Sequence, residues 1–177
     1  MRALIVYESV FGNTHAIAEA VADGLRPAYE VVVVHPEEAG PALIDGVDLL
    51  VVGGPTHMHT MATEHTKAQG AHAEELKAEH GDPSHPIEEA AFGESLRDWF
   101  RDLAPAMGRA AAFDTRVDGS PILTGRASKA IAKRLRHQGR ELVVEPESFL
   151  VDKANDLLPG ELVRAAGWAR TLVPEGS

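Results

Sequence analysis

Three short apolar runs in the first third of the chain constrain its fold more than any other feature. Residues 3–7, 30–34 and 48–52 are rich in valine, leucine and isoleucine and show no regular alternation with polar residues. Strands that are apolar on both faces are typical of the centre of a parallel sheet that helices cover on both sides. The runs therefore predict three strands of a buried parallel sheet, whose order in the sheet is left open.

Helical periodicity between and after these runs completes an alternating pattern. After the first run, Ile17, Val21 and Leu25 share one helix face. Further helices are predicted at 96–103, around 131–135 and at 162–172, and further strands at 110–115 and at 141–145, with 149–151 as a continuation. Parallel strands need helical crossovers of one hand. We therefore expect an α/β fold with three layers, a doubly wound five-stranded parallel sheet between helices.

The length of the chain and its least regular segment define the expected domain organisation. The 177 residues fit a single domain, since domains of about 100–200 residues are typical. Residues 57–94 are rich in His, Glu, Ala and Gly with weak periodicity, which indicates an excursion from the regular pattern. We expect one domain over residues 1–173 that carries this excursion, and a short tail at 174–177.

Composition and charge exclude several classes of function. The chain has no cysteine, so thiolate metal sites, disulfides and cysteine nucleophiles are excluded. The net charge of -10 disfavours nucleic acids and anionic membranes and would attract a basic partner protein. The first apolar run is too short for a signal peptide, and no run reaches the roughly 20 residues of a membrane span. A cytoplasmic protein is expected, while its oligomeric state is left open.

The loop at residues 8–15, between the first strand and the first helix, is the strongest candidate for a binding site. Ser9 and Thr14 place hydroxyl groups on either side of Gly12, where the chain enters the helix. The start of a helix binds anions through free backbone N–H groups and the positive end of its dipole, without any Lys or Arg. The loop lacks both Gly-Lys-Ser/Thr and Gly-x-Gly-x-x-Gly, which disfavours ATP, GTP and NAD. It therefore predicts a different phosphate-bearing ligand.

This loop resembles the first loop of the flavodoxin family, which reads (Ser/Thr)-x-Thr-Gly-x-Thr and wraps the phosphate of FMN. Ser9, Gly12, Asn13 and Thr14 match that pattern, while larger side chains replace the small Gly or Thr residues that are common at the two positions between Ser9 and Gly12. The resemblance implies noncovalent FMN as the cofactor. It also implies that the phosphate is held by Ser9, Val10, Phe11, Gly12, Asn13 and Thr14.

Two later segments extend the resemblance, because that family covers the two faces of the flavin ring with two further loops. The second loop follows the third strand and maps onto Pro55, Thr56, His57, Met58 and His59. The third follows the fourth strand and maps, by position rather than by motif, onto Asp114, Thr115, Arg116, Asp118 and Gly119. The implied function is electron transfer by a flavodoxin-like protein, and a basic redox partner would suit its charge.

Other functions stay open at this point. Flavodoxin-like proteins include FMN-dependent quinone and porphyrinogen oxidoreductases, which the sequence does not separate from electron carriers, and no catalytic residue is assigned. A binding or regulatory module could also keep the fold without the cofactor. A metal site is less favoured, since no spacing matches the metal-binding pattern His-Glu-x-x-His. The histidines of the excursion are His57, His59, His65, His72, His80 and His85.

Overall fold

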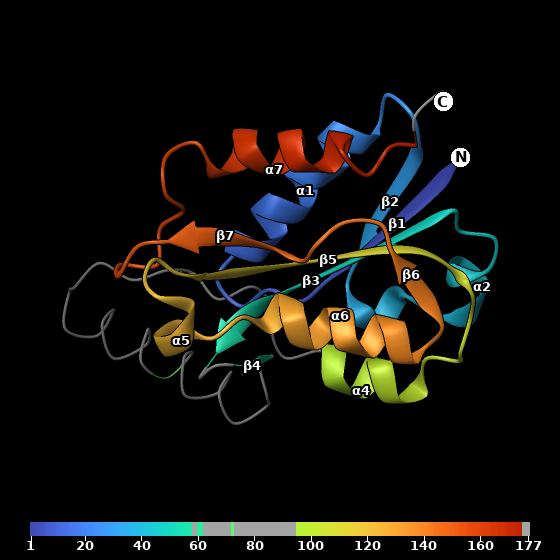
Figure 1. The fold of residues 1–177 in the computed structure, drawn as a ribbon, viewed down its shortest axis with the longest axis horizontal. Coiled ribbons are helices and arrows are strands. Elements are labelled where there is room, and N and C mark those ends of the chain that lie inside the picture. Colours follow the sequence, from blue (N-terminus) through green and yellow to red (C-terminus); the bar gives the residue numbers. More distant parts are fainter. Residues whose placement is uncertain (58–59, 62–71, 73–94, 175–177) are drawn as a thin grey trace.

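The computed structural model describes residues 1–57, 60–61, 72 and 95–174. Figure 1 shows a sheet with helices on both sides. The strands are β1 (Arg2–Tyr7), β2 (Glu30–Val34), β3 (Leu49–His57), β4 (Thr60–Met61), β5 (Gly108–Val117), β6 (Arg140–Leu142) and β7 (Glu147–Val151). The helices are α1 (Asn13–Leu25), a 3₁₀ turn η1 (Pro36–Glu38), α2 (Pro41–Ile44), α4 (Leu96–Asp102), α5 (Pro121–Thr124), α6 (Ala127–His137) and α7 (Glu161–Arg170).

The sheet has the doubly wound topology that the sequence predicts. Its strands follow the order β2-β1-β3-β5-β6, and these neighbours pair in parallel. The strand order turns around at β1 and β3, so the two halves of the sheet are wound in opposite directions from this point. The short strand β4 is antiparallel to β3 and lies off the main path.

The fifth predicted strand is divided in two. β6 pairs with the start of β5, from Gly108 to Ala110, and β7 pairs with its end, from Phe113 to Val117. The expected strand at 141–145 is therefore wrong beyond Leu142, and the expected continuation at 149–151 is a separate strand. Pro146 lies between the two strands and has no N–H group to continue the ladder, which explains the break.

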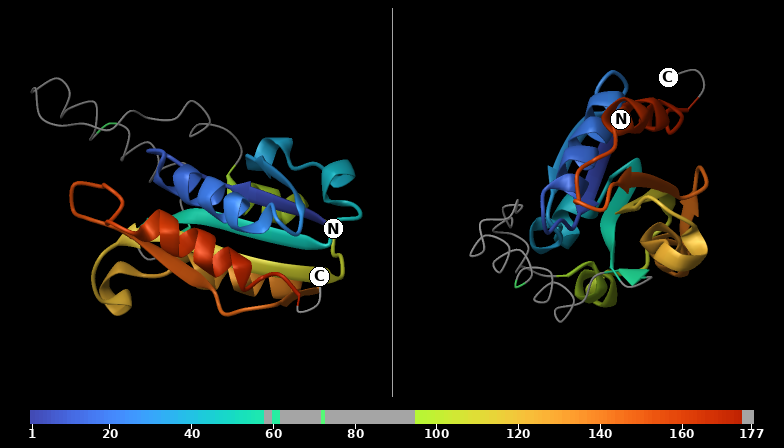
Figure 2. Two further views of the ribbon diagram at one scale, coloured as in Figure 1. Left: turned by 90° about the horizontal axis from the view of Figure 1, so that it is seen from above. Right: turned by 90° about the vertical axis from the view of Figure 1, so that its left-hand side faces the viewer.

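The two faces of the sheet are covered by different helices (Figure 2). On one face, α1 and α7 pack against alternate strand residues such as Ile5 and Val51. On the other face, α4 and α6 pack against the intervening strand residues, such as Leu4 and Leu50. Both sets of strand side chains are fully or almost fully buried, so the apolar runs correspond to strands buried on both faces.

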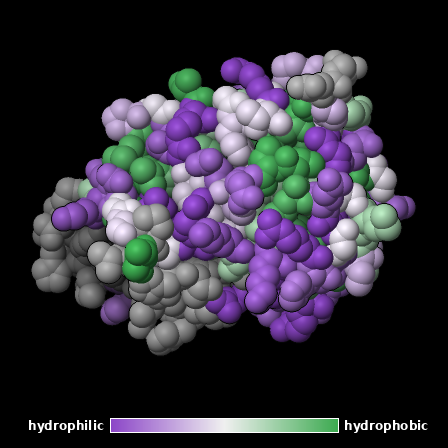
Figure 3. Space-filling model, in the orientation of Figure 1, coloured by the Kyte–Doolittle hydropathy of each residue, from purple (hydrophilic) through white to green (hydrophobic). Residues whose placement is uncertain are grey.

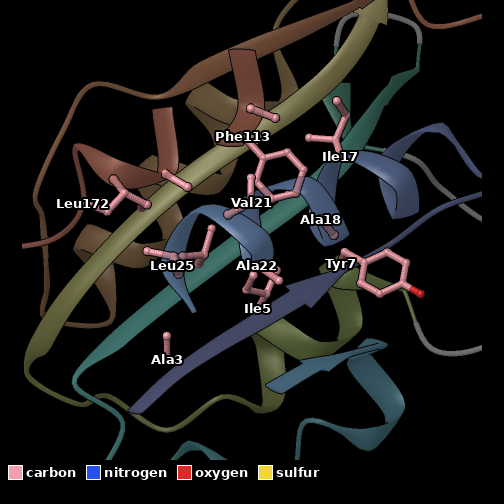
Figure 4. Packing of buried hydrophobic residues seen from close by; sticks show 14 of the residues in the cluster. Ala3, Ile5, Tyr7, Ile17, Ala18, Val21, Ala22, Leu25, Phe113 and Leu172 are labelled. Carbon is pink, nitrogen blue, oxygen red and sulfur yellow. The ribbon is translucent and has the colours of Figure 1, made fainter. Parts of the chain in front are cut away.

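Two glycines allow unusually close packing in the first of these layers. A Cβ atom on Gly53 of β3 would lie 2.0 Å from Cζ of Phe113, whose ring lies among the side chains of α1 in Figure 4. A Cβ atom on Gly24 of α1 would lie 2.4 Å from the carbonyl oxygen of Ala166 in α7. Both glycines are therefore required by the approach of neighbouring elements.

The outer surface of α6 is basic and solvated. Figure 3 shows hydrophilic side chains gathered over this helix. Lys129, Lys133 and Arg136 are exposed, while Ile131 and Leu135 are fully buried on the opposite side. The helix ends before Gly139, which has a φ of 87°, a left-handed conformation that glycine commonly provides after a helix. The predicted amphipathic helix and its terminal glycine are confirmed.

Candidate functional site

The loop between β1 and α1 turns directly into the helix through Gly12. This residue is the N-cap of α1 and has a φ of 84°, in the left-handed region that favours glycine. Its N–H group donates to Oγ of Ser9 at 3.1 Å, and its carbonyl oxygen accepts from Ala16 at 2.9 Å. The first N–H groups of a helix have no intrahelical acceptor, so the positive end of the α1 dipole is presented beside this loop.

A cavity of about 210 Å³ lies at this end of α1. It is at the carboxyl ends of the parallel strands, where ligands bind in doubly wound sheets. It brings together parts of all three predicted loops. The lining residues are Ser9, Val10, Phe11, Asn13, Thr14, Pro55, Thr56, Thr115, Arg116, Val117, Val151 and Asn155.

Val10 and Phe11, the large residues of the first loop, line this cavity without filling it. Val10 is buried and Phe11 is half-buried, yet the remaining volume is about 210 Å³. One water molecule needs only about 10–15 Å³ by this kind of measure. The cavity therefore has room for a phosphate group.

Both hydroxyl groups of the first loop have partners within the protein. Oγ1 of Thr14 lies 2.7 Å from Oγ1 of Thr115 on β5, and Oγ of Ser9 accepts the bond from Gly12. A hydroxyl group can donate one hydrogen bond and accept others. Ser9 and one member of the threonine pair therefore keep a proton with which to bind an anion in the cavity.

Asn155 belongs to the cavity but was missed by the sequence analysis. It follows β7 and has a φ of 71°, the only positive φ of a non-glycine residue among those described. Its carbonyl oxygen accepts a 2.7 Å hydrogen bond from Nδ2 of Asn13, which ties the turn after β7 to the start of α1. Its own Nδ2 is buried without a partner. The one available signal was an asparagine in a polar turn, because asparagine tolerates this conformation.

Arg116, which also lines the cavity, has an unpartnered nitrogen donor as well. Its Nη1 donates to the carbonyl oxygen of Gly119 at 2.9 Å and to Oγ1 of Thr124 at 3.2 Å, so the turn after β5 holds the guanidinium group. Its Nε is buried without a partner. Arg116 and Asn155 both line the cavity, and each has one buried nitrogen donor without a partner.

Asp114 and Thr56, both predicted to contact the cofactor, cap α6. The fully buried Oδ2 of Asp114 accepts from Oγ1 of Thr56 at 2.9 Å and from the backbone N–H of Ser128 at 2.8 Å. Oγ1 of Thr56 in turn accepts from the N–H of Ala127 at 2.8 Å. The two side chains bind the first N–H groups of α6, and the carboxylate is stabilised by the positive end of that helix.

The remaining predicted site residues lie elsewhere. Asp118 and Gly119 are exposed in the turn after β5 and do not line the cavity. His57 ends β3, which continues through the predicted second loop, and Met58 and His59 lie outside the described residues. Of the six histidines considered for a metal site, only His57 and His72 belong to the described part of the chain. Within that part, no three His, Cys, Asp or Glu residues form a group that could hold a metal.

None of the described helices is both long enough and apolar enough to cross a membrane.

A parallel sheet with this strand order, and a loop after its first strand that turns through Gly12 into the start of α1, are the features of a flavodoxin-like α/β fold. Residues 4–80 match the family model Flavodoxin_5, a flavodoxin domain, whereas a search of curated proteins found no match. The resemblance to the flavodoxin family is thus confirmed, by sequence in the first half of the chain and by fold over its length.

Solved structures extend this likeness to the whole fold. Oxidised flavodoxin 1 from Bacillus cereus is 16% identical with a TM-score of 0.64, and each chain is covered to 100%. A flavodoxin from the domain Archaea is 19% identical with a TM-score of 0.62, over 97% of this chain and 96% of that one. The rubredoxin oxygen:oxidoreductase of Desulfovibrio gigas is 15% identical with a TM-score of 0.59, and 97% of this chain matches 35% of that one.

Proposed function

We propose that this protein binds FMN noncovalently and functions in electron transfer. The observation that carries the proposal is the cavity at the start of α1, which is lined by all three loops. Two of its lining residues, Arg116 and Asn155, each carry a buried nitrogen donor without a partner. A phosphate ester would accept hydrogen bonds from these donors, Arg116 Nε and Asn155 Nδ2. It would also lie at the positive end of the α1 dipole, which stabilises negative charge.

The residues present fit the phosphate end of FMN. Gly12 turns the chain into α1 in a left-handed conformation. The hydroxyl proton of Ser9 and one hydroxyl proton of the Thr14–Thr115 pair remain to be donated. The cavity of about 210 Å³ is smaller than the roughly 300–1,000 Å³ of sites that enclose a whole ligand of drug size. The proposal therefore assigns the phosphate end to this cavity and places the flavin ring between the second and third loops.

The loops around the cavity would then contact different parts of bound FMN. The loop at 8–12 and the start of α1 bind and orient the phosphate, and Pro55 and Thr115 contact the cofactor beyond it. Bound FMN would supply reversible redox chemistry. The net charge of -10 would attract a basic redox partner and accelerate the encounter at low ionic strength.

The test compares FMN with riboflavin, which lacks the phosphate. Asn155→Gly keeps a residue that tolerates positive φ and removes the Nδ2 donor. We expect it to weaken FMN binding by about tenfold, because a hydrogen bond to a charged group is lost, and to leave riboflavin binding unchanged. Flavin fluorescence titration of the apoprotein measures both, with Arg136→Gln as a control at an exposed arginine.

Three outcomes bear on the proposal and its alternatives. Failure of the wild-type protein to bind FMN would contradict the proposal and favour a cofactor-free module on the same fold. Equal losses for FMN and riboflavin in Asn155→Gly would contradict the assignment of the phosphate to this cavity. If the FMN complex catalyses oxidation of NAD(P)H by a quinone over many turnovers, the protein is an oxidoreductase rather than a carrier.

A further inference from the structure

A second and larger cavity lies at the opposite end of the sheet. Its volume is about 830 Å³, within the range of roughly 300–1,000 Å³ that is typical of small-molecule sites. It is bordered by α2, α4, the segments that lead into β3 and β5, and the first residue of β6. Figure 1 shows α2, α4 and β6 away from the end that carries α5. It shares no lining residue with the cavity at the start of α1.

Arg140, the first residue of β6, is a buried cation in the wall of this cavity. The residue is only 5% exposed, and its Nε is buried without a hydrogen-bond partner. Within the described residues, its guanidinium group forms no ion pair or hydrogen bond. Burial lowers the pKa of Arg140 from its ordinary value, although a guanidinium group remains charged in proteins. A charge that is largely removed from water and has no counter-ion is unfavourable, so an anion bound in the cavity would stabilise Arg140.

The neighbour of Arg140 on β5 leaves space for the guanidinium group. Gly108 pairs with Arg140 across the sheet and has a φ of 144°. A Cβ atom at this position would lie 2.9 Å from Nη1 of Arg140. Any other residue at position 108 would therefore push the guanidinium group from its place in the cavity wall.

The rest of the wall is largely apolar, with acidic groups at exposed positions. Trp99 donates its indole N–H to the carbonyl oxygen of Ala39 at 2.9 Å, so its ring offers the cavity a hydrocarbon surface. Met107 also lines the cavity and is 91% exposed. The further apolar side chains include Ile44, Val47 and Leu103, and the exposed acidic residues are Glu37, Asp45 and Asp102.

We propose that this cavity binds a small organic carboxylate with an apolar body, whose carboxylate group pairs with Arg140. A guanidinium group binds a carboxylate through two parallel hydrogen bonds, and the apolar wall binds the hydrocarbon part. The three exposed carboxylates would repel a ligand with several negative charges, such as a phosphate ester. The site thus selects a single negative charge attached to a hydrophobic group.

Hexanoate is a suitable probe, with hexan-1-ol, acetate and inorganic phosphate as comparisons. Trp99 reports binding directly in a Trp168→Phe variant of the full chain, which retains one tryptophan. We expect hexanoate to bind with a dissociation constant on the order of 1 mM, and the three other probes to bind at least about tenfold more weakly, because each lacks one part of the recognition. No FMN is added, so the result is independent of the proposed electron-transfer function.

Arg140→Met tests the role of the cation, since it keeps much of the side-chain length and removes the charge. We expect the affinity of Arg140→Met for hexanoate to fall to its affinity for hexan-1-ol. Arg136→Met, at an exposed position on α6, should change the affinity for neither hexanoate nor hexan-1-ol. If Arg140→Met fails to fold, the wild-type comparison of hexanoate with hexan-1-ol decides alone. Equal binding of these two probes, unchanged discrimination in Arg140→Met, or tighter binding of phosphate than of hexanoate would overturn the proposal.

Discussion

The hydroxyl oxygens of Thr14 and Thr115 lie 2.7 Å apart, although the residues are 101 positions apart in the sequence. The contact joins the first turn of α1 to β5, and both residues are buried. Thr115→Val keeps the shape of the side chain but leaves the hydroxyl group of Thr14 without this partner. We expect a loss of about 1–2 kcal/mol in the free energy of unfolding, measured by urea denaturation.

The double variant Thr14→Val/Thr115→Val is the control for this pair. Because both hydroxyl groups are removed together, no unpaired polar group is left, and its loss should be smaller than the sum of the two single losses. Strictly additive losses would show that the two hydroxyl groups do not interact.

Two helical glycines should respond in opposite directions to replacement by alanine. Gly24→Ala places a methyl group 2.4 Å from the carbonyl oxygen of Ala166 and 2.6 Å from Cβ of Ala169, so we expect destabilisation by about 1–3 kcal/mol. Gly167→Ala, in the interior of α7, meets nothing within 4 Å and should stabilise by about 0.5–1 kcal/mol through helix propensity. Thermal unfolding followed by circular dichroism measures both, and a stable Gly24→Ala protein would contradict the close approach of α1 and α7.

Glu161 should make stability depend on pH in the acidic range. Burial raises the pKa of this carboxyl group, but hydrogen bonds from Arg164 and from the N–H of Leu150, together with the charge of Arg164, outweigh that effect and lower the pKa overall. The stabilisation is therefore fully present above the ordinary value of 4.5 and is lost as the pH falls through the lower pKa of the folded state.

Replacing this carboxylate should remove that dependence. We expect Glu161→Gln to lower stability at pH 7 by about 1–2 kcal/mol and to flatten the decline of stability below pH 4.5, since the neutral side chain no longer titrates. Denaturant unfolding between pH 3 and pH 7 measures both. The half-exposed partner Glu147, which bonds to Arg164 at 2.8 Å, provides a matched variant, Glu147→Gln, with a smaller expected effect. An unchanged pH profile in Glu161→Gln would refute the interpretation.

Asp114 should matter more for folding than for flavin binding. Its Oδ2 accepts bonds from Thr56 and from the N–H of Ser128, and its side chain does not line the cavity at the start of α1. We expect Asp114→Ala to lose about 2–4 kcal/mol of stability, because the cap of α6 loses its charged acceptor. The proposed FMN affinity of the folded fraction should change less than twofold, and a selective loss of FMN affinity would instead assign Asp114 to the cofactor site.

Sequence reasoning works well where burial alone determines the element. β1 and β2 begin and end within one residue of the predicted runs, because valine, leucine and isoleucine at successive positions indicate a strand covered on both faces. β3 extends five residues beyond its predicted end. Gly53, Gly54 and Pro55 look like a turn in the sequence, yet the first two pack closely under Phe113 and Leu96, and the ladder continues to Pro55 and Thr115.

In the candidate sites, too, the sequence predicts features with a local signature but not those that depend on tertiary contacts. The loop at 8–15 was found because a glycine between two hydroxyl residues at the start of a helix has a local signature. Asn155 and Arg140 have none, since each becomes unusual only when the folded chain buries one of its side-chain nitrogen atoms without a partner. The capping of α6 by Thr56 and Asp114 is likewise a tertiary contact, across 71 and 14 positions of sequence.

The length of β5 separates the two cavities. This strand of ten residues begins beside Met107, which lines the larger cavity, and ends at Val117, which lines the smaller one. At about 3.3 Å per residue it spans roughly 30 Å, several times the Debye length of about 8 Å at physiological ionic strength. Interactions between solvent-exposed charges are largely screened over such a distance. A charge bound at the mouth of one cavity should therefore change the affinity of the other cavity only slightly.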